Sequence, residues 1–257
     1  MLQSEAIDYF SAIELAPAPQ RSTFNTLLST PPNGLPGDLV HAGRDNGAVI
    51  GDAVVGLTDR LSEQNAKDVM NCVSLAQQVA NQRANKETHL GQWCDAYFEV
   101  LRYAGWNTRN YARQRYSPSA RSFSMDQIAL EIIQAASQGQ LAFVEMARRA
   151  FGALESNEKA LNILENNSAS ETFATFQTLP CTETRSGTPA MIMTCIDFKK
   201  RVRQRKVLFF RFNRTDVDIY RAATQIELNT SHYARIRNQI EDKLYMGAQD
   251  FFANIEL

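Results

Sequence analysis

The pattern of apolar residues changes near residue 168, and this change constrains the fold more than any other feature of the sequence. Before it, apolar side chains recur at helical spacing; after it, short β-rich runs alternate with turn signals. Helices followed by strands are typical of an α+β fold, in which helices pack on a sheet. We therefore predict an N-terminal helical region, a C-terminal antiparallel β-meander of about four strands, and a closing C-terminal helix.

Five segments of the first half have a helical pattern. The second of them ends before Gly105, which is a natural C′ residue. The third begins at Ser124, where Gln127 three residues later completes a capping box, and Gly139 ends it. We expect helices over about residues 61–80, 90–104, 124–138, 140–152 and 156–166.

The second half holds four β-rich runs: TFATFQTLPC, AMIMTCIDF, KVLFFRF and VDIYRAATQIEL. Turns are expected at Arg185-Ser186-Gly187 and over 213–216. KVLFFRF is apolar on both parities, which predicts a central strand covered on both faces. The last helix begins near Ser231, and we expect Gly247 to interrupt it.

Residues 1–46 are predicted to be an irregular, proline-rich leader with one short helix at most, around residues 22–29. The run GAVIGDAVVGL follows and reads as a buried helix or strand. We assign residues 47–257 to a single α+β domain, with a helical part over 47–167 and the sheet plus helix over 168–257. A division near residue 168 is the alternative.

Most catalytic signatures are missing from the sequence. There is no GxSxG, GxxxxGK[ST], GxGxxG or HExxH, so no catalytic residue, cofactor or metal site is assigned. The histidines, His41, His89 and His232, are scattered, although a Cys–His pair assembled in space stays open. A net charge of −1 argues against a dedicated nucleic-acid binder. The N-terminus lacks the regions of a signal peptide, so we expect a cytoplasmic protein at synthesis, with later release or membrane association.

The clearest charged feature is a run of six cations in eight residues between two β-rich runs. A solvated loop that guards the VLFFRF segment against aggregation is one interpretation. Attraction to an anionic membrane, at about 1 kcal/mol per charge, is another, and attraction to a phosphate backbone is a third. The arginines between residues 109 and 121 would extend the patch if they lie nearby. The run consists of Lys199, Lys200, Arg201, Arg203, Arg205 and Lys206.

Four cysteines lie far apart, and no pair has CxxC spacing. With a turn centred on residues 186–187, Cys181 lies opposite Ile192 or Met193, and Cys195 lies opposite a residue within 177–179. The two thiols are then not directly opposed, so a strain-free disulfide between them is doubtful. Cys72 and Cys94 fall on or beside helix stripes and are predicted to be small core residues.

Several stretches resemble the Erwinia virulence factor (Evf)-like family over about residues 47–257. They are NAKDVMNCVSLAQQVAN, QWCDAYFEVLRYAGW, SFSMDQIALEIIQA, LPCTE, KVLFFRF and ELNTSHYARIRNQIEDKL. The resemblance implies a bacterial α/β protein that promotes survival in an insect gut. It also implies a thioester-linked palmitoyl chain, held in an apolar tunnel, on a cysteine of the second half. Cys181 is the first choice for that residue and Cys195 the second.

The leading functional hypothesis is a non-enzymatic bacterial virulence or host-interaction factor, acylated on a cysteine and associating with membranes. Its partners would be a fatty acyl chain and an anionic membrane surface. One alternative is a hydrolase or acyltransferase with a cysteine nucleophile. Another is a membrane-perturbing, insecticidal-type toxin in which GAVIGDAVVGL inserts into the bilayer.

Overall fold

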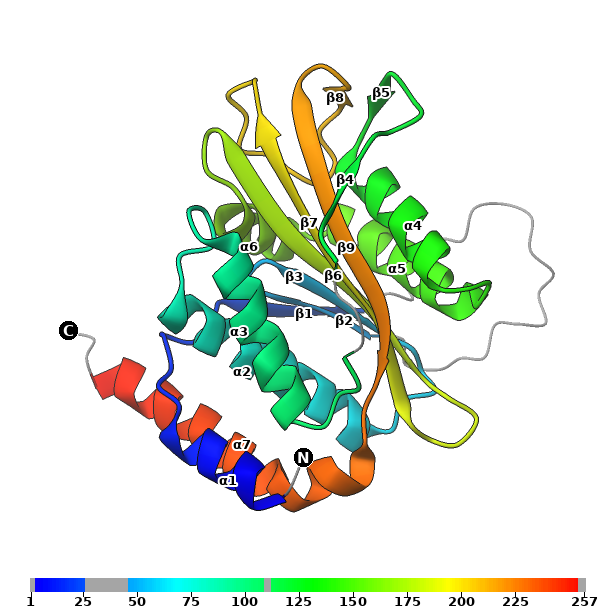
Figure 1. Ribbon diagram of the computed structural model, residues 1–257. Helices are drawn as coiled ribbons and strands as arrows, with labels where there is room; N and C mark the ends of the chain where they lie inside the picture. The colour runs from blue at the N-terminus through cyan, green and yellow to red at the C-terminus, as the bar shows by residue number, and fades with distance from the viewer. Residues whose placement is uncertain (1–2, 26–45, 109–111, 254–257) are drawn as a thin grey trace. The chain divides into compact units, whose positions relative to one another are not determined.

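The computed structural model describes residues 3–25, 46–108 and 112–253 and has the predicted α+β fold (Figure 1). The chain divides into two compact units. Unit 1 comprises residues 1–20, 63–109 and 226–257, and unit 2 comprises residues 21–62 and 110–225. The assignment of residues 47–257 to a single domain stays a prediction.

Unit 1 is helical and contains α1 (Gln3–Ala12), α2 (Glu63–Arg83), α3 (Leu90–Tyr103) and α7 (Thr230–Ala253). Helix α2 packs against α3 and α7, and α1 lies beside α7 (Figure 1). Gly105 follows α3 with φ +96°, a conformation that glycine adopts without strain, so the predicted stop is confirmed. Helix α7 continues through Gly247, where we expected an interruption.

A buried ion pair joins two helices of unit 1. Arg237 on α7 donates to both carboxylate oxygens of Asp68 on α2, at 3.0 and 2.7 Å. The Asp68 side chain is 1% exposed, so the paired charge is what allows it to be buried.

Unit 2 is built on a seven-stranded mixed sheet in the order β1-β2-β3-β6-β7-β9-β4. Strands β3 and β6 are parallel, whereas the β1–β2, β2–β3, β6–β7 and β4–β9 pairs are antiparallel. The predicted four-stranded meander is therefore too small, because residues before the predicted sheet supply four strands, and only three of the four predicted strands join the sheet. The strands are β1 (Arg21–Asn25), β2 (Asn46–Ile50), β3 (Ala53–Leu57), β4 (Gln114–Tyr116), β6 (Phe173–Glu183), β7 (Pro189–Lys200) and β9 (Val217–Glu227).

The first three of these extra strands correct and sharpen the N-terminal predictions, and α1 shows that the leader expected to be irregular is helical over Gln3–Ala12. GAVIGDAVVGL forms the β2–β3 hairpin, which confirms its strand interpretation, and Gly51 turns it with φ +56°. The helix expected around residues 22–29 is wrong over residues 22–25, which belong to β1; residues 26–29 lie outside the described residues. Pairing with β2 along its whole length explains why this short segment is extended.

Three helices of unit 2 cover one face of its sheet: α4 (Met125–Ala136), α5 (Leu141–Glu155) and α6 (Glu158–Ser168) (Figure 1). The predicted capping box starts α4, where the Ser124 amide donates to Gln127 Oε1 at 3.1 Å. Gly56 on β3 allows α5 to approach closely, since a Cβ there would lie 3.0 Å from Met146 Cγ. Phe176 of β6 belongs to the core beneath these helices.

KVLFFRF is not a strand, which corrects the sequence prediction. Residues 207–211 are irregular, and only the last residue of the run enters the short pair β5 (Ser122–Phe123) and β8 (Phe212–Asn213). The Leu208 carbonyl accepts the amides of Met125 and Asp126, at 2.9 and 3.2 Å, and so satisfies two donors at the start of α4. The run is apolar because it crosses the core, where Leu208 is fully buried.

Candidate functional site

Lys200 ends strand β7 and is the one buried member of the cationic run. Its Nζ donates to the carbonyl oxygen of Ser170 at 2.6 Å and to that of Gln204. Burial, and then the charge of Arg205, lower the pKa of Lys200. This side chain therefore ties the irregular segment 201–206 to the end of the sheet instead of contributing to the surface.

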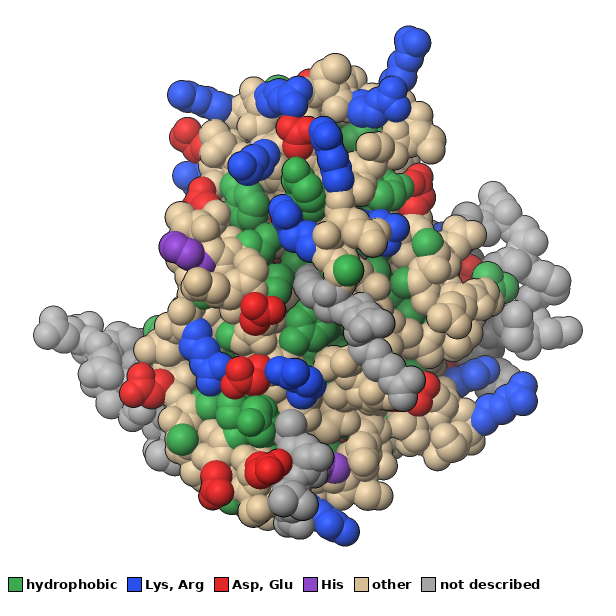
Figure 2. Space-filling model, viewed as in Figure 1, with side chains coloured by type: hydrophobic (Ala, Val, Ile, Leu, Met, Phe, Trp, Pro, Cys, Tyr) green, Lys and Arg blue, Asp and Glu red, His purple; other side chains and the backbone are tan. Residues whose placement is uncertain are grey.

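The other five cations of the run are exposed. Arg203 lies 3.9 Å from Glu171 with both side chains largely in solvent, and such a pair contributes little to stability. Figure 2 shows Lys and Arg side chains gathered over the end of unit 2 where Figure 1 places β5 and β8. We call this surface the basic end; its members from the run are Lys199, Arg201, Arg203, Arg205 and Lys206.

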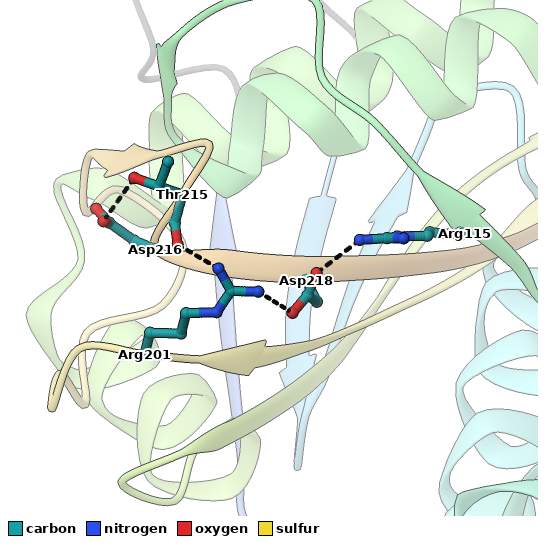
Figure 3. Close-up of polar contacts among 5 residues, drawn as sticks. All are labelled: Arg115, Arg201, Thr215, Asp216 and Asp218. Atoms are coloured by element: carbon teal, nitrogen blue, oxygen red, sulfur yellow. Dashed lines mark hydrogen bonds and ion pairs between the residues drawn. The ribbon is translucent and has the colours of Figure 1, made fainter.

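At the basic end, Asp218 on β9 lies between two arginines (Figure 3). Arg201 Nη2 donates to Asp218 Oδ2 at 2.7 Å, and Arg115 Nη2 on β4 donates to Oδ1 at 2.8 Å. Arg201 Nη1 also donates to the carbonyl oxygen of Thr215 at 3.0 Å. Hydrogen bonds from Arg201, and then from Arg115, hold the pKa of Asp218 below its usual range. The carboxylate is therefore ionised at neutral pH and fixes both guanidinium groups.

A hollow of about 250 Å³ opens beside these side chains, and we call it the arginine hollow. Its third guanidinium comes from Arg214, which lies in the predicted turn; the turn is confirmed, since the Asp216 amide donates to Asn213 O at 2.9 Å. Arg214 Nη1 donates to the carbonyl oxygen of Pro118 at 3.2 Å. The hollow is smaller than pockets for drug-sized ligands, at about 300–1,000 Å³, so it suits one small group. The rest of its lining is Tyr116, Ser117, Pro118, Thr215, Val217 and Ile219.

Sequence reasoning found part of this site. The run at 199–206 and the arginines of 109–121 were singled out, and the structure brings Arg201 and Arg115 together. It missed Arg214 and Asp218, whose only signal was a turn flanked by β-rich runs. Because the turn returns the chain to the same end of the sheet, its arginine joins the other two.

Cys181 and Cys195 lie on the same face of the sheet and are both buried. Cys195 lies opposite Gln177, within the predicted range, whereas Cys181 lies opposite Met191, next to the predicted partners. The two cysteines are four residues apart along the ladder, about 13 Å at the usual strand rise. This separation excludes a disulfide between them, which the sequence made doubtful.

Cys195 belongs to a buried polar cluster. Its Sγ lies 3.7 Å from Thr175 Oγ1. Neither amide atom of the buried Gln177 side chain has a hydrogen-bond partner among the described residues. Two residues further along β7, the Asp197 carboxylate accepts two hydrogen bonds from Arg113, at 2.9 and 2.5 Å.

All four cysteines are buried thiols, as predicted for Cys72 and Cys94. Burial raises the pKa of Cys72 to about 12, which suppresses its thiolate form at neutral pH. Of the histidines, His89 and His232 belong to unit 1, and His41 lies outside the described residues. In the part of unit 2 that the structure describes, no histidine therefore accompanies either sheet cysteine.

Two features are absent from residues 3–25, 46–108 and 112–253. No group of three His, Cys, Asp or Glu side chains there is arranged to hold a metal ion. None of the helices there combines the length and the apolar character needed to cross a bilayer. The segment considered for membrane insertion, residues 47–57, is almost entirely buried as β2 and β3.

The arginine hollow and the exposed cations of the run concentrate positive charge at the basic end of unit 2. No family model matches the chain, and no curated protein matches it. Similar solved structures include the Evf virulence factor, with 12% identity, coverage of 78% of this chain and 82% of that chain, and a TM-score of 0.41. A delta-endotoxin has 14% identity, coverage of 78% and 90%, and a TM-score of 0.40. Activated Cyt2Ba from Bacillus thuringiensis subsp. israelensis has 11% identity, coverage of 68% and 95%, and a TM-score of 0.36.

These likenesses have TM-scores below 0.5 and establish neither a family nor a function for this chain. Membership of the Erwinia virulence factor family stays a prediction.

Proposed function

We propose that this protein is a non-enzymatic binding protein that associates with anionic membrane surfaces through the basic end of unit 2. One observation carries the proposal: Arg201, from the cationic run of residues 199–206, lines a hollow with two further arginines, Arg115 and Arg214, at the end of unit 2 where Lys and Arg side chains gather (Figure 2). A bacterial virulence or host-interaction role, including a toxin-like one, is the wider setting that the sequence resemblance implies.

The expected strength follows from the charges that reach the surface. Lys199, Arg203, Arg205 and Lys206 are exposed and lie outside the Asp218 cluster. At about 1 kcal/mol each, they would supply about 4 kcal/mol, roughly a thousandfold in affinity for an anionic vesicle. Because these charges are solvent-exposed, the affinity should fall steeply with salt.

Vesicle flotation tests the proposal. Changing Lys199, Arg203, Arg205 and Lys206 together to Gln should abolish flotation with anionic vesicles. The matched control changes four exposed cations elsewhere in unit 2, at Arg60, Arg148, Lys159 and Arg185, to Gln and should float like the wild type. Equal loss in both variants would mean that only net charge matters, and no loss in either would remove the membrane role of the basic end.

Acylation of a sheet cysteine is a second, separable part of the proposal. Gln177 favours Cys195 over Cys181, since its buried amide lies directly opposite Cys195 and can donate to the carbonyl oxygen of a thioester. Intact mass before and after hydroxylamine tests the modification, and Cys195→Ser against Cys181→Ser assigns it. An unmodified mass for protein made in bacteria would argue against acylation.

The cysteine-nucleophile alternative makes a different prediction. Substituting Cys181 or Cys195 by Ala would then abolish a hydrolase or transferase activity. Dye leakage from vesicles separates the toxin alternative from passive binding, because a surface-associated protein leaves the dye enclosed.

A further inference from the structure

We propose that the arginine hollow is a binding site for a phosphate monoester, presented at the membrane as a lipid headgroup. The lipid source rests on the proposed function, whereas the phosphate chemistry rests on the hollow alone. Arg115, Arg201 and Arg214 carry the site, and Asp218 positions two of them.

The hydrogen-bond donors of the hollow are mostly unused. Three guanidinium groups have fifteen N–H donors, of which four donate to oxygens of the described residues. The acceptors are the Asp218 carboxylate and the carbonyls of Thr215 and Pro118. Each arginine is thus anchored by at least one bond while most of its planar fork remains available, and that fork matches phosphate oxygens in pairs.

The charge of the hollow distinguishes phosphate monoesters from other small anions. Three guanidinium groups and one carboxylate leave two net positive charges. A phosphate monoester carries about −1.5 to −2 at pH 7 and has three terminal oxygens. A phosphodiester or a carboxylate has one charge and two such oxygens, so it leaves both charge and donors unmatched.

The walls of the hollow fit a headgroup that continues into an apolar molecule. Tyr116, Pro118, Val217 and Ile219 form its apolar lining, and Val217 and Ile219 belong to the core of unit 2. Arg115 and Arg201 are 67% and 61% exposed, so a headgroup can reach them from solvent while its apolar part meets these walls. The hollow shares Arg201 with the cationic run, so it lies at the basic end, where a membrane would lie under the proposed function.

Vesicles matched for surface charge test the site. Phosphatidylcholine vesicles contain either phosphatidic acid, a monoester, or phosphatidylglycerol, a diester, at fractions adjusted to equal zeta potential. One additional bidentate, charge-assisted contact is worth about 1.5–3 kcal/mol, so at pH 7.5 we expect roughly tenfold tighter binding to phosphatidic acid or more. Equal binding to the two vesicles would overturn the monoester site and leave the proposed function standing, whereas binding to neither would overturn both.

Arginine-to-lysine variants distinguish the contribution of the planar, bidentate guanidinium geometry from that of the positive charge. Arg115→Lys and Arg201→Lys keep a positive charge but lose the planar fork, so the preference for phosphatidic acid should fall to about threefold or less. Arg185→Lys, in the β6–β7 turn, is the matched control and should retain the full preference. A preference that survives both hollow variants, with unchanged thermal stability, would overturn the assignment.

A soluble monoester identifies the source of the phosphate. Glycerol 3-phosphate at millimolar concentration should weaken wild-type binding to phosphatidic acid vesicles to the level seen with phosphatidylglycerol vesicles, and should leave phosphatidylglycerol binding unchanged. Micromolar binding of glycerol 3-phosphate without vesicles, lost in Arg115→Lys, would support the phosphate site but overturn its lipid source. Absence of any competition would overturn the phosphate chemistry.

Discussion

Replacing Arg113 by Met should destabilise unit 2, because it leaves the buried carboxylate of Asp197 without its charged partner. The Asp197 side chain is 3% exposed and accepts two hydrogen bonds from Arg113. Breaking a buried pair by removing one partner costs about 3–5 kcal/mol. The Arg113 side chain is 45% exposed, so water can replace part of it, and we expect a loss of about 2–3 kcal/mol.

The Arg113 guanidinium also stacks on Tyr220, with Cζ 3.9 Å from the ring centroid, and that contact is worth about 0.5–1 kcal/mol of the total. Urea denaturation measures the change in the free energy of unfolding, and the melting temperature should fall by roughly 5–10 °C. The single variant Asp197→Asn and the double variant Arg113→Met/Asp197→Asn complete a double-mutant cycle, which measures the interaction energy of the pair. We expect the double variant to be more stable than Arg113→Met alone, since no charge is then left buried. A loss below about 0.5 kcal/mol, or additive effects in the cycle, would mean that the Arg113–Asp197 pair does not stabilise unit 2.

Three further results are expected. Leu208→Ala should lower the free energy of unfolding by about 2–4 kcal/mol, whereas Leu141→Ala, at a residue 70% exposed, should change it by less than about 0.5 kcal/mol in the same urea experiment. Lys200→Met should speed tryptic cleavage within residues 201–206 relative to Lys199→Met, because the bonds that hold this segment are lost. Folding also lowers the pKa of Lys200, so the free energy of unfolding of the wild type should rise with pH just below about 10.4, and this rise should be absent in Lys200→Met. The preference for phosphatidic acid should shrink from pH 7.5 to 5.5, since the monoester gains a proton near pH 6 while Asp218, whose pKa is lowered, keeps its charge; a constant preference would contradict this.

Local signals in the sequence predicted local structure well. The Ser124–Gln127 capping box starts α4, and Gly105 follows α3, because both signals act through backbone groups within one turn. The 213–216 turn was also predicted, since its residues bond to one another. Non-local pairing could not be predicted in this way: β3 and β6 are more than a hundred residues apart, and nothing within either strand specifies the other.

Burial explains two errors of the sequence predictions, the strand expected at KVLFFRF and the surface position expected for Lys200. Val207 and Leu208 are apolar because the chain crosses the core there, and a core-crossing segment and a central strand have the same composition. Lys200 looked like one more surface cation, although carbonyls from two other segments hold it inside. The cationic run of residues 199–206 could be identified in the sequence. Its proximity to Arg115 and Arg214 in the arginine hollow could not, because it depends on β9 pairing beside the end of β7.

Equilibrium binding to anionic vesicles tests the central proposal most directly. The wild-type protein and the Lys199, Arg203, Arg205 and Lys206 to Gln variant are titrated with phosphatidylglycerol vesicles and with neutral vesicles. We expect the wild-type protein to bind anionic vesicles but not neutral ones, with an affinity that falls between about 0.05 and 0.3 M salt and is at least a hundredfold lower in the variant. Binding that does not change with salt concentration, or that the variant retains in full, would contradict the proposed membrane role of the basic end.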